Sequence, residues 1–459
     1  MNDKELEEKR IALLGMGVEN RSVGRYLAER GIGFSVCDAR TEEELPDASE
    51  WVHLTRSWHL GPDYLDGLDE FDLLFRTPGI SPLNPALVRA REAGASLHSQ
   101  TRLFLERCPA AVVGITGTKG KGTTCSLLFE MLRDGPYGQV WLGGNMGTPP
   151  VDFLDDISAS DLVILELSSF QLQDLDRSPA VSVVLNITPD HLDYHADLDE
   201  YVKAKKSICR YQSADDTLIV DADCGTASRF AGDSPARPME FSMSGPVEAG
   251  AFLEGGRLWA RPFNAEAVPL CHASDLKLRG RHNVANALAA AAAAVAVGAP
   301  AGRLAPRLRS FPGLEHRLEH VATRNGVAFC NDSLATTPEA ALAAVASFDE
   351  PVLLIAGGSS KGADFTALAR GIADRGVKAL ILLVGEEGQR LADAVRACGY
   401  SGEIVPGCQG VAEAVAAAMQ RAAPGDVVLL SPACASFGMF ASYAERGAKF
   451  KEAVAEIRE

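Results

Sequence analysis

The stretch AAVVGITGTKGKGTTCSLLFEMLRDG, residues 110–135, contains the features that decide the fold. Its apolar start predicts a strand, the glycine-rich run 114–124 predicts a turn, and the apolar segment that follows predicts a helix. A strand that leads through a glycine turn into a helix points several backbone N–H groups, and the positive end of the helix dipole, at one place. The stretch therefore predicts a phosphate-binding loop in an α/β domain.

The residue types in this loop suit a nucleotide. Gly117 and Gly120 allow the backbone to curl closely around an anion, and Lys121 can reach the outer phosphates. Thr123 or Thr124 can offer a hydroxyl group to Mg²⁺. The loop by itself therefore predicts nucleotide binding, with a hydroxyl group available for a magnesium ion.

The run nevertheless departs from the strict pattern GxxxxGK[ST]. Ile115 stands where the first glycine belongs, and Gly122 follows the lysine. Glycine–lysine turns that bind no nucleotide are common, so a purely structural turn remains the alternative on this pattern alone.

The residues before the loop predict a smaller α/β domain. An apolar strand (IALLG), a glycine turn (GMG), an amphipathic helix (SVGRYLAERG) and a second strand (FSVCDAR) form a βαβ unit. The apolar stretch DLLFRTPGIS and the helix-like PALVRAREAG follow. We expect a Rossmann-like N-terminal domain over residues 1–108.

The residues after the loop predict two further parts. The strands DLVILEL, VSVVLNI and DTLIVDA, with an alanine-rich helix from Asn283 to about Val297, extend a central P-loop ATPase-type α/β domain over residues 109–311. The alanines predict a tightly packed, buried helix. Four more strands (GVAFCND, VLLIAGG, ALILLVG and DVVLLSP) alternate with helices and predict a C-terminal Rossmann-like α/β domain over residues 312–459.

Composition limits the class of function. The chain has 459 residues, 47% of them hydrophobic and 23% charged, and contains no apolar run long enough to cross a bilayer. The start, MNDKELEEKR, lacks the apolar stretch of a signal peptide, so we expect a cytoplasmic protein. We also expect a monomer. The net charge of −17 argues against general nucleic-acid binding. The ten cysteines include no CxxC pair and predict reduced, mostly structural thiols.

Acidic and imidazole side chains follow two of the central strands. Glu166 ends the strand DLVILEL, and Asp190, His191, Asp193 and His195 crowd the segment LNITPDHLDYH. Ligands gather at the carboxyl ends of parallel strands, and oxygen and imidazole groups suit Mg²⁺ or Mn²⁺. A lone glutamate at a strand end is more often solvated or capping, and zinc is disfavoured because no cysteine or HExxH pattern accompanies these residues.

Further polar groups occupy loops and a helix start in the second half of the chain. His282, Asn283 and Asn286 open the segment GRHNVANALAA, where capping explains only one of them comfortably. Loops after C-terminal strands carry five more candidates: Asp332, Thr336, Lys361, Ser431 and Ser436. Such residues populate loops for turn chemistry as well, so only their joint placement favours a site.

With these residues in view, the chain resembles the Mur ligases along essentially its whole length, and most of all their D-glutamate-adding branch. The resemblance rests on ten motifs in the order of that family: GITGTKGKGTT (114–124), GNMGTPP (144–150), LELSSFQL (165–172), LNITPDHLDYH (185–195), YVKAKKSIC (201–209), GRHNVANALAA (280–290), GLEHRLE (313–319), NDSLATTP (331–338), GGSSKGADF (357–365) and SPACASFGMF (431–440).

The resemblance implies an ATP-dependent amide ligase of peptidoglycan precursor synthesis, and hence a role in cell wall formation, cell shape and cell division. Its first domain would hold UDP-N-acetylmuramoyl-L-alanine, its central domain ATP with two Mg²⁺ ions (or Mn²⁺), and its last domain glutamate. The implied catalytic residues are Lys121, Glu166, His191 and Lys205, and the implied metal ligands are Thr123, Glu166, His191 and Lys205. Lys205 is similar to the family's carbamylated lysine.

The resemblance also implies three sets of binding residues. Those for ATP are Gly117, Thr118, Lys119, Gly120, Lys121, Gly122, Thr123, Thr124, Asn283, Asn286, Arg317 and Asp332. Those for the sugar nucleotide and its alanine are Gly15, Met16, Gly17, Val18, Asp38, Arg40, Thr77, Pro78, Gly79, Asn145 and Ser168. Those for glutamate are Thr336, Lys361, Ser436, Phe437 and Tyr443.

The chain departs from the branch at a few positions. Gly122 replaces a hydroxyl residue, as in folylpolyglutamate synthetases, which would move the metal-binding hydroxyl to Thr123. Leu334 stands where the branch usually has a lysine. The segment SFGMF stands where the branch usually has SLDQF, and Tyr443 stands where it usually has a phenylalanine. The amino-acid pocket is therefore altered. We expect D-glutamate as the acceptor, because reversed stereochemistry requires several contacts to move, and L-glutamate is the alternative.

Three other classes fit less well. A folylpolyglutamate synthetase lacks the βαβ domain ahead of the phosphate loop, and a P-loop kinase lacks the third α/β domain. A non-catalytic nucleotide-binding protein would not need Lys121, Glu166, His191 and Lys205 together.

Overall fold

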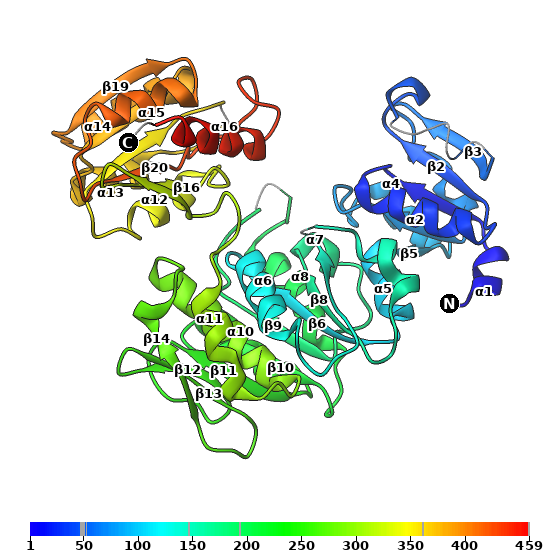
Figure 1. The fold of residues 1–459 in the computed structure, drawn as a ribbon. Helices are drawn as coiled ribbons and strands as arrows, with labels where there is room; N and C mark the ends of the chain where they lie inside the picture. The colour runs from blue at the N-terminus through cyan, green and yellow to red at the C-terminus, as the bar shows by residue number, and fades with distance from the viewer. Residues whose placement is uncertain (46–50, 52, 146, 192–193, 360–361, 458–459) are drawn as a thin grey trace. The chain divides into compact units, whose positions relative to one another are not determined.

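The computed structural model describes residues 1–45, 51, 53–145, 147–191, 194–359 and 362–457. Three β-sheets, each accompanied by helices, follow one another along the chain and appear in blue, cyan to green, and yellow to red in Figure 1. This arrangement confirms the prediction of an α/β protein with three such parts. Among the described residues, no helix combines the length and the apolar character that crossing a bilayer requires.

The first sheet has five strands in the order β3-β2-β1-β4-β5, all parallel. Its strands are β1 (Ile11–Leu14), β2 (Phe34–Asp38), β3 (Thr55–Leu60), β4 (Leu73–Arg76) and β5 (Ser96–His98). The helices of this part are α1 (Asp3–Glu7), α2 (Val18–Glu29), α4 (Pro85–Glu92) and α5 (Gln100–Arg107). Parallel strands covered on both faces are mostly apolar, and β1 and β4 are buried at every position.

The second sheet has nine strands in the order β14-β13-β12-β11-β10-β9-β6-β8-β7. Its strands are β6 (Ala111–Thr116), β7 (Val140–Gly144), β8 (Leu162–Glu166), β9 (Val181–Val184), β10 (Thr217–Asp221), β11 (Arg237–Ser242), β12 (Gly250–Glu254), β13 (Arg257–Arg261) and β14 (Val268–His272). The order places β6 between β8 and β9, and the three strands are parallel, so their carboxyl ends lie side by side at one edge of the sheet.

The helices of this second part are α6 (Lys121–Leu132), α7 (Ser169–Leu172), α8 (Leu198–Arg210), α9 (Gly225–Ser228), α10 (Arg281–Ala296) and α11 (Leu304–Ser310), with the 3-10 helix η3 (Pro150–Asp156). The alanines of α10 from Ala289 to Ala294 are fully buried. The prediction of a tightly packed alanine-rich helix is therefore confirmed.

The strands β12, β13 and β14 form an antiparallel meander at one end of this sheet. Gly255 and Gly256 connect β12 to β13, and both have a positive φ, +57° and +73°. A two-residue turn with positive φ at both positions matches the right-handed twist of the strands that it joins. The meander was not among the predicted strands, although the glycine pair is a hairpin signal.

The third sheet has the order β15-β16-β20-β17-β18-β19, with β15 antiparallel to its neighbour. Its strands are β15 (Glu319–Arg324), β16 (Val327–Asn331), β17 (Val352–Ala356), β18 (Ala379–Leu383), β19 (Glu403–Cys408) and β20 (Val427–Leu430). Its helices are α12 (Pro338–Val345), α13 (Thr366–Arg375), α14 (Glu386–Ala397), α15 (Val411–Met419) and α16 (Tyr443–Ala455). Alternate residues of β17 belong to two separate cores, so both faces of this sheet are covered.

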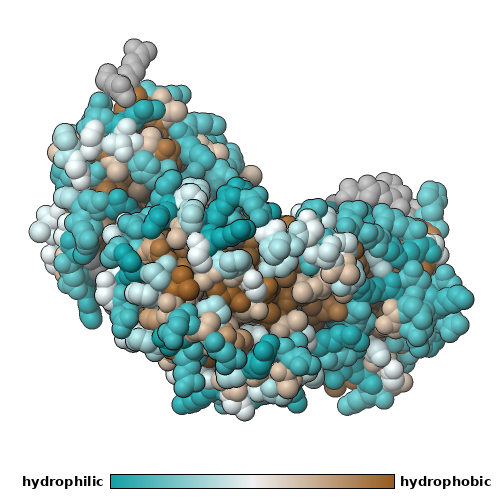
Figure 2. Space-filling model, turned by 60° about the horizontal axis from the view of Figure 1, so that its bottom comes forward, coloured by the Kyte–Doolittle hydropathy of each residue, from teal (hydrophilic) through white to brown (hydrophobic). Residues whose placement is uncertain are grey.

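The chain divides into two compact units. One consists of Met1–Ala273 with Ala285–Leu308, and the other of Ser274–Val284 with Arg309–Glu459. The first two sheets lie in the first unit and the third sheet in the second. On the face drawn in Figure 2, hydrophilic residues cover much of the surface and hydrophobic residues show between them.

Candidate active site

The glycine-rich loop lies between the end of β6 and the start of α6, as the sequence predicts. The Lys121 ammonium group donates to the carbonyl oxygens of Gly117, at 3.0 Å, and Thr118, at 3.1 Å. The lysine therefore folds back over the loop from the first turn of the helix. Gly120 caps α6 with a φ of +91°, a left-handed conformation that favours glycine.

Close packing is a second reason for the glycines of this loop. A Cβ atom on Gly120 would lie 2.2 Å from Oδ1 of Asn286, and one on Gly117 would lie 2.6 Å from Cβ of Leu185. Asn286, predicted to contact the adenine, therefore lies against the loop. Asn283 is also predicted to contact the adenine, but it belongs to the second compact unit. Its side chain donates to the carbonyl oxygen of Arg279 at 2.7 Å.

The segment after β9 supports the loop from the other side. The Thr118 amide donates to the carbonyl oxygen of Asn186 at 2.7 Å, and its hydroxyl donates to that of Thr188 at 3.0 Å. The Lys119 ammonium group lies 3.3 Å from Oδ2 of Asp190. These contacts attach the phosphate loop to the segment that carries His191.

Lys205 is buried on α8, with 2% of its surface exposed. Its ammonium group donates to the hydroxyl oxygen of Thr116 at 3.3 Å and to the carbonyl oxygen of Gly117 at 3.1 Å. Burial, and then the charge of Lys121, hold the pKa of Lys205 well below its usual range. A neutral amine beneath the phosphate loop is a nucleophile, whereas an ammonium group is not.

Glu166 ends β8 and is nearly buried, with 7% exposed. The Asn145 side chain donates to its Oε1 atom at 3.0 Å, and the Asn145 amide donates to its carbonyl oxygen at 2.8 Å. Gly144, with a φ of +107°, makes this approach possible, because a Cβ there would lie 2.2 Å from the Glu166 carbonyl oxygen. The structure thus brings together two predicted residues from the ends of neighbouring strands.

Ser168 begins α7 with a capping box. Its hydroxyl accepts from the Gln171 amide at 3.3 Å, and the Gln171 side chain accepts from the Ser168 amide at 3.0 Å. The Gln171 side chain also donates to Glu19 of α2 at 2.7 Å. Ser168 therefore has a structural use beside its predicted substrate contact.

His191 is half exposed and has a φ of +54°. Its Nε2 atom lies 3.9 Å from Oδ2 of Asp190, and its ring packs against Phe170 with centroids 5.0 Å apart. His195 is buried instead, where its ring nitrogens contact the Glu200 carboxylate and, at 2.9 Å, the Ser169 hydroxyl. Both ring nitrogens of His195 are thus already engaged by neighbouring side chains. Asp193 lies outside the described residues.

Among the described residues, one group of three acidic or imidazole side chains has ligand atoms within 4.8 Å of one another, namely Glu315, His316 and Glu319. The Lys451 ammonium group donates to both carboxylates, at 2.7 and 2.9 Å. A cation of the protein therefore already pairs with this group. The predicted metal ligands Glu166 and His191 do not form such a group on their own.

The predicted contacts for the sugar nucleotide meet at the ends of β1, β2 and β4. The Met16 amide donates to Oδ2 of Asp38 at 2.6 Å, and the Arg40 guanidinium holds both Asp38 oxygens, at 2.9 and 2.8 Å. Burial opposes ionisation of Asp38, but the hydrogen bonds from Arg40 and Met16 outweigh it and lower the pKa of this carboxyl. A Cβ on Gly15, whose φ is +76°, would lie 2.7 Å from Cγ2 of Thr77.

The second unit carries the residues predicted for glutamate. Thr336 is partly buried after β16, Ser436 is buried after β20, and Phe437 and Tyr443 are exposed, by 64% and 42%. Leu334, the departure from the usual lysine, is partly buried in the same segment as Thr336. Lys361 lies outside the described residues.

Asp332, predicted for ATP, directly follows β16 and is nearly buried. It accepts from the Ser431 hydroxyl at 2.8 Å and from the Leu318 amide at 3.1 Å. Burial raises the pKa of Asp332 to about 7, although these hydrogen bonds and the charge of Arg317 act in the opposite direction.

Two buried arginines that support these loops were not predicted from the sequence. Arg446 of α16 is fully buried and donates to the Ser333 hydroxyl at 3.0 Å, to the Ser333 carbonyl at 2.9 Å and to the Cys434 carbonyl at 3.2 Å. Arg76 ends β4 and is 1% exposed. Its signal was present, because a charged residue closes the otherwise apolar run LLFR directly before Thr77.

The chain matches three domain families in order. They are the Mur ligase MurD-like N-terminal domain over residues 9–99, the Mur ligase middle domain over residues 115–294 and the Mur ligase glutamate ligase domain over residues 316–434. Proteins named UDP-N-acetylmuramoylalanine–D-glutamate ligase match over their full length. The one from Symbiobacterium thermophilum is 41% identical, covering 97% of this chain and 98% of that protein, and the one from Acetivibrio thermocellus is 40% identical, covering 100% and 99%.

Solved structures share the fold at low identity. UDP-N-acetylmuramate-alanine ligase MurC from Thermotoga maritima has a TM-score of 0.58 at 19% identity and covers 98% of this chain and 99% of its own. A pseudomurein peptide ligase type C from Methanothermus fervidus has a TM-score of 0.57 at 18% identity, with 98% and 100% covered. The three-part α/β architecture is therefore shared with these ligases.

Proposed function

The chain belongs to the Mur ligase family, and we propose that it catalyses the reaction for which its full-length relatives are named. It joins D-glutamate to UDP-N-acetylmuramoyl-L-alanine in an ATP-dependent reaction of peptidoglycan synthesis. The observation that carries this proposal is the relation to the Symbiobacterium enzyme, with 41% identity over 97% of this chain and 98% of that protein.

The chemistry follows from the poor reactivity of an ionised carboxylate. A carboxylate oxygen of the alanyl group attacks the γ-phosphorus of ATP, the bond to the β-phosphate oxygen breaks, and ADP leaves with that electron pair. The resulting acyl phosphate is attacked by the amine of D-glutamate, which loses a proton as inorganic phosphate leaves. The products are an amide, ADP and phosphate.

Lys121 is the chain's own cation for the phosphoryl transfer. Its contacts with the Gly117 and Thr118 carbonyl oxygens hold its ammonium group over the loop that would receive the phosphates. A positive group fixed in advance stabilises charge that moves during the reaction without reorganising at that moment.

Magnesium is the metal that the donor set fits. The Glu166 Oε1 atom accepts a hydrogen bond from the Asn145 side chain, which orients the carboxylate at the strand end. Hard oxygen donors suit Mg²⁺. We propose Glu166, Thr123, His191 and a carboxylated Lys205 as the residues that hold two such ions. When bound, they would neutralise charge on the phosphates.

Lys205 would need to change its charge to take part. A neutral lysine amine adds to carbon dioxide and releases a proton, which leaves a carbamate anion. The lowered pKa of Lys205 supports this step, because only the unprotonated amine can add. The carbamate would offer oxygen ligands in place of a cation.

The substrates divide among three parts of the chain. We propose that residues 1–108 bind the sugar nucleotide, 109–311 bind ATP and 312–459 bind glutamate. The UDP portion would contact Gly15 to Val18, Asp38, Arg40 and Thr77 to Gly79, and the muramoyl-alanine portion Asn145 and Ser168. ATP would contact residues 117–124 with Asn283, Asn286, Arg317 and Asp332, and glutamate would contact Thr336, Lys361, Ser436, Phe437 and Tyr443. We further propose a monomer that acts in the cytoplasm.

The test is phosphate release from ATP by the purified protein. We expect release when UDP-N-acetylmuramoyl-L-alanine and D-glutamate are both present, and much less when either is omitted. D- and L-glutamate are compared side by side, because Leu334 replaces a cation in the proposed amino-acid pocket. Faster turnover with L-glutamate would change the acceptor, and release only with a folate and glutamate would overturn the assignment.

A further inference from the structure

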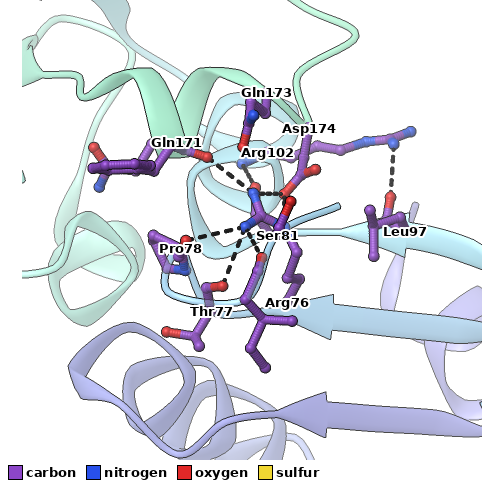
Figure 3. A network of polar contacts seen from close by, with 12 residues as sticks. Arg76, Thr77, Pro78, Ser81, Leu97, Arg102, Gln171, Gln173 and Asp174 are labelled. Carbon is purple, nitrogen blue, oxygen red and sulfur yellow. Dashed lines mark hydrogen bonds and ion pairs between the residues drawn. The ribbon is translucent and has the colours of Figure 1, made fainter. Parts of the chain in front are cut away.

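Arg76 lies where the first two sheets meet, and its guanidinium group has acceptors on both sides. Its Nε and Nη2 atoms contact Oδ2 of Asp174 at 2.7 and 2.5 Å, and the two side chains are 1% and 2% exposed. Figure 3 shows the Arg76 side chain reaching from the end of its strand toward Asp174 and toward the backbone of Thr77 and Pro78. A buried cation is thus paired with a carboxylate from the segment after α7.

The other nitrogen of Arg76 gathers the loop that follows its own strand. Nη1 donates to the carbonyl oxygens of Thr77, at 3.3 Å, Pro78, at 3.2 Å, and Ile80. Arginine suits this task because its planar group presents five donors in a fixed arrangement. Three carbonyl oxygens of one short loop are therefore turned toward one side chain.

Tyr194 completes the arrangement from the segment that carries His191. Its hydroxyl lies 3.0 Å from the Pro78 carbonyl oxygen, to which it donates, and accepts from Arg76 Nη1 at 3.2 Å. Arg76 Nη2 also donates to the carbonyl oxygen of Phe170 at 2.9 Å, and the Phe170 ring packs against those of His191 and Tyr194. Buried or partly buried side chains thus join the loop after β4 to the segment that carries His191, a proposed metal ligand.

The position of this loop matters for an anionic substrate. Thr77 packs directly against Gly15, so a movement of the loop would change the glycine turn after β1. Carbonyl oxygens carry partial negative charge, and a loop that exposed them would repel a diphosphate. By accepting hydrogen bonds from Arg76 and Tyr194, the carbonyl groups of Thr77, Pro78 and Ile80 are turned away from such a ligand.

We propose that Arg76 is a positioning residue, which with Asp174 and Tyr194 shapes the loop of residues 77–80 for the diphosphate of the first substrate and joins it to the segment of His191. The identity of that substrate rests on the proposed function. Because the guanidinium group is buried and engaged, Arg76 acts through the loop rather than on the substrate.

Arg76→Lys and Tyr194→Phe test this role, and Arg102→Lys is the matched control. Lysine keeps the charge beside Asp174 but loses the planar donor group, and phenylalanine removes only a hydroxyl. Arg102 also reaches from the first part of the chain to an aspartate of the second, Asp176, but it contacts the Leu97 carbonyl and not residues 77–80. We expect Arg76→Lys to raise the KM for UDP-N-acetylmuramoyl-L-alanine about tenfold, because small displacements of positioning groups are costly.

The KM for ATP should change less than about twofold in Arg76→Lys, Tyr194→Phe should follow in the same direction with a smaller change, and Arg102→Lys should match the wild type. A folded Arg76→Lys variant with an unchanged KM for the sugar nucleotide would overturn the proposal. An equal rise in the KM for ATP would do so as well.

Amide hydrogen exchange supplies a readout that needs no substrate. Residues 77–81 should exchange faster in Arg76→Lys and in Tyr194→Phe than in the wild type, while Arg102→Lys leaves them unchanged. A wild-type protein without turnover would contradict the proposed function alone. Unchanged exchange at residues 77–81 in both variants would contradict the positioning role alone.

Discussion

The ammonium groups of Lys121 and Lys205 donate to the same carbonyl oxygen, that of Gly117, at 3.0 and 3.1 Å. They approach it from different helices, α6 and α8. Two cations beside one neutral acceptor repel each other. The pKa of Lys205 is lowered because this lysine is buried and lies near the charge of Lys121. The glycine-rich loop thus has one charged lysine above it and one with a strong tendency to be neutral beneath it.

Replacing Lys205 by methionine should stabilise the protein while it removes activity. At neutral pH the unfolded chain binds a proton at this lysine that the folded chain binds poorly, so folding is penalised, and the penalty falls as pH rises toward the lysine's ordinary pKa. Thermal unfolding at pH 7 in buffer depleted of carbon dioxide should show a higher unfolding temperature for Lys205→Met than for the wild type, because methionine does not carry this penalty.

Lys206→Met is the control for this prediction. Lys206 is 36% exposed and pairs with Asp233 at 2.7 Å, so its replacement should not stabilise the protein. If Lys205→Met proved less stable than the wild type, the hydrogen bonds to Thr116 and Gly117 would outweigh the cost of burial.

Lys121→Ala should lower the rate of phosphate release by at least about 10²–10³-fold, because a fixed positive group is lost from the phosphate loop. Steady-state kinetics with all three substrates measures the effect. Lys203→Ala, on the exposed face of α8, is the control and should keep the wild-type rate. A wild-type rate in Lys121→Ala would remove this lysine from the mechanism.

Gly144→Ala should disturb Glu166 although it introduces a single methyl group. The new Cβ would meet the Glu166 carbonyl oxygen at 2.2 Å, and the φ of +107° is unfavourable for alanine. We expect a loss of about 1–3 kcal/mol in the free energy of unfolding and a higher Mg²⁺ concentration at half-maximal rate. Denaturant unfolding and a magnesium titration check the two effects.

Gly302→Ala separates this effect from a general cost of adding a methyl group. A Cβ at Gly302 meets no atom within 4 Å. The unfolding free energy should therefore stay within about 0.5 kcal/mol of the wild type. Equal behaviour of the two alanine variants would show that the contact with Glu166 is unimportant.

Asp332→Asn should change how stability depends on pH. The folded-state pKa of about 7 lies above the usual value of 3.8, so between these pH values the folded protein binds more protons than the unfolded chain. Raising the pH through this window therefore destabilises the wild type, by on the order of 4 kcal/mol from this group, with no further loss above it. Asparagine does not titrate.

The free energy of unfolding of the wild type and of Asp332→Asn is measured by urea unfolding at pH 4.5 and pH 8, from the transition in which the second unit unfolds. The wild type should lose more stability than the variant between the two pH values. An identical loss in both proteins would mean that the Asp332 carboxyl titrates normally.

Local patterns sufficed for much of the fold. The run 114–124 predicted the turn between β6 and α6, and the apolar runs predicted β1, β2, β4 and four strands of the third sheet, β16, β17, β18 and β20, but not β15 or β19. The hairpin of β12 and β13 was missed although Gly255 and Gly256 are its signal. These strands mix buried residues with partly buried or exposed ones, and such short mixed runs are harder to recognise than uniformly apolar ones.

Contacts between distant residues could not be predicted in the same way. The helical period places Tyr201 and Lys205 on one face of α8, but no local pattern says that this face lies under Gly117, 88 residues earlier. Arg76 and Asp174 are 98 residues apart, and burial rather than sequence spacing makes their pairing important. Such relations depend on how the strands are ordered in the sheets.

Among the described residues, the ion pairs between the first two parts of the chain all have the same polarity. Arg25, Arg30, Arg76 and Arg102 belong to the first part, and their partners Asp152, Asp155, Asp174 and Asp176 belong to the second. A chimera that combined the first part of this chain with the central part of a relative lacking these aspartates would remove all four partners. Arg30 would still have Asp3 and Arg102 would still have Glu106, whereas the buried Arg76 would lose its carboxylate. Exchanging one part without the other should therefore cost stability mainly at Arg76.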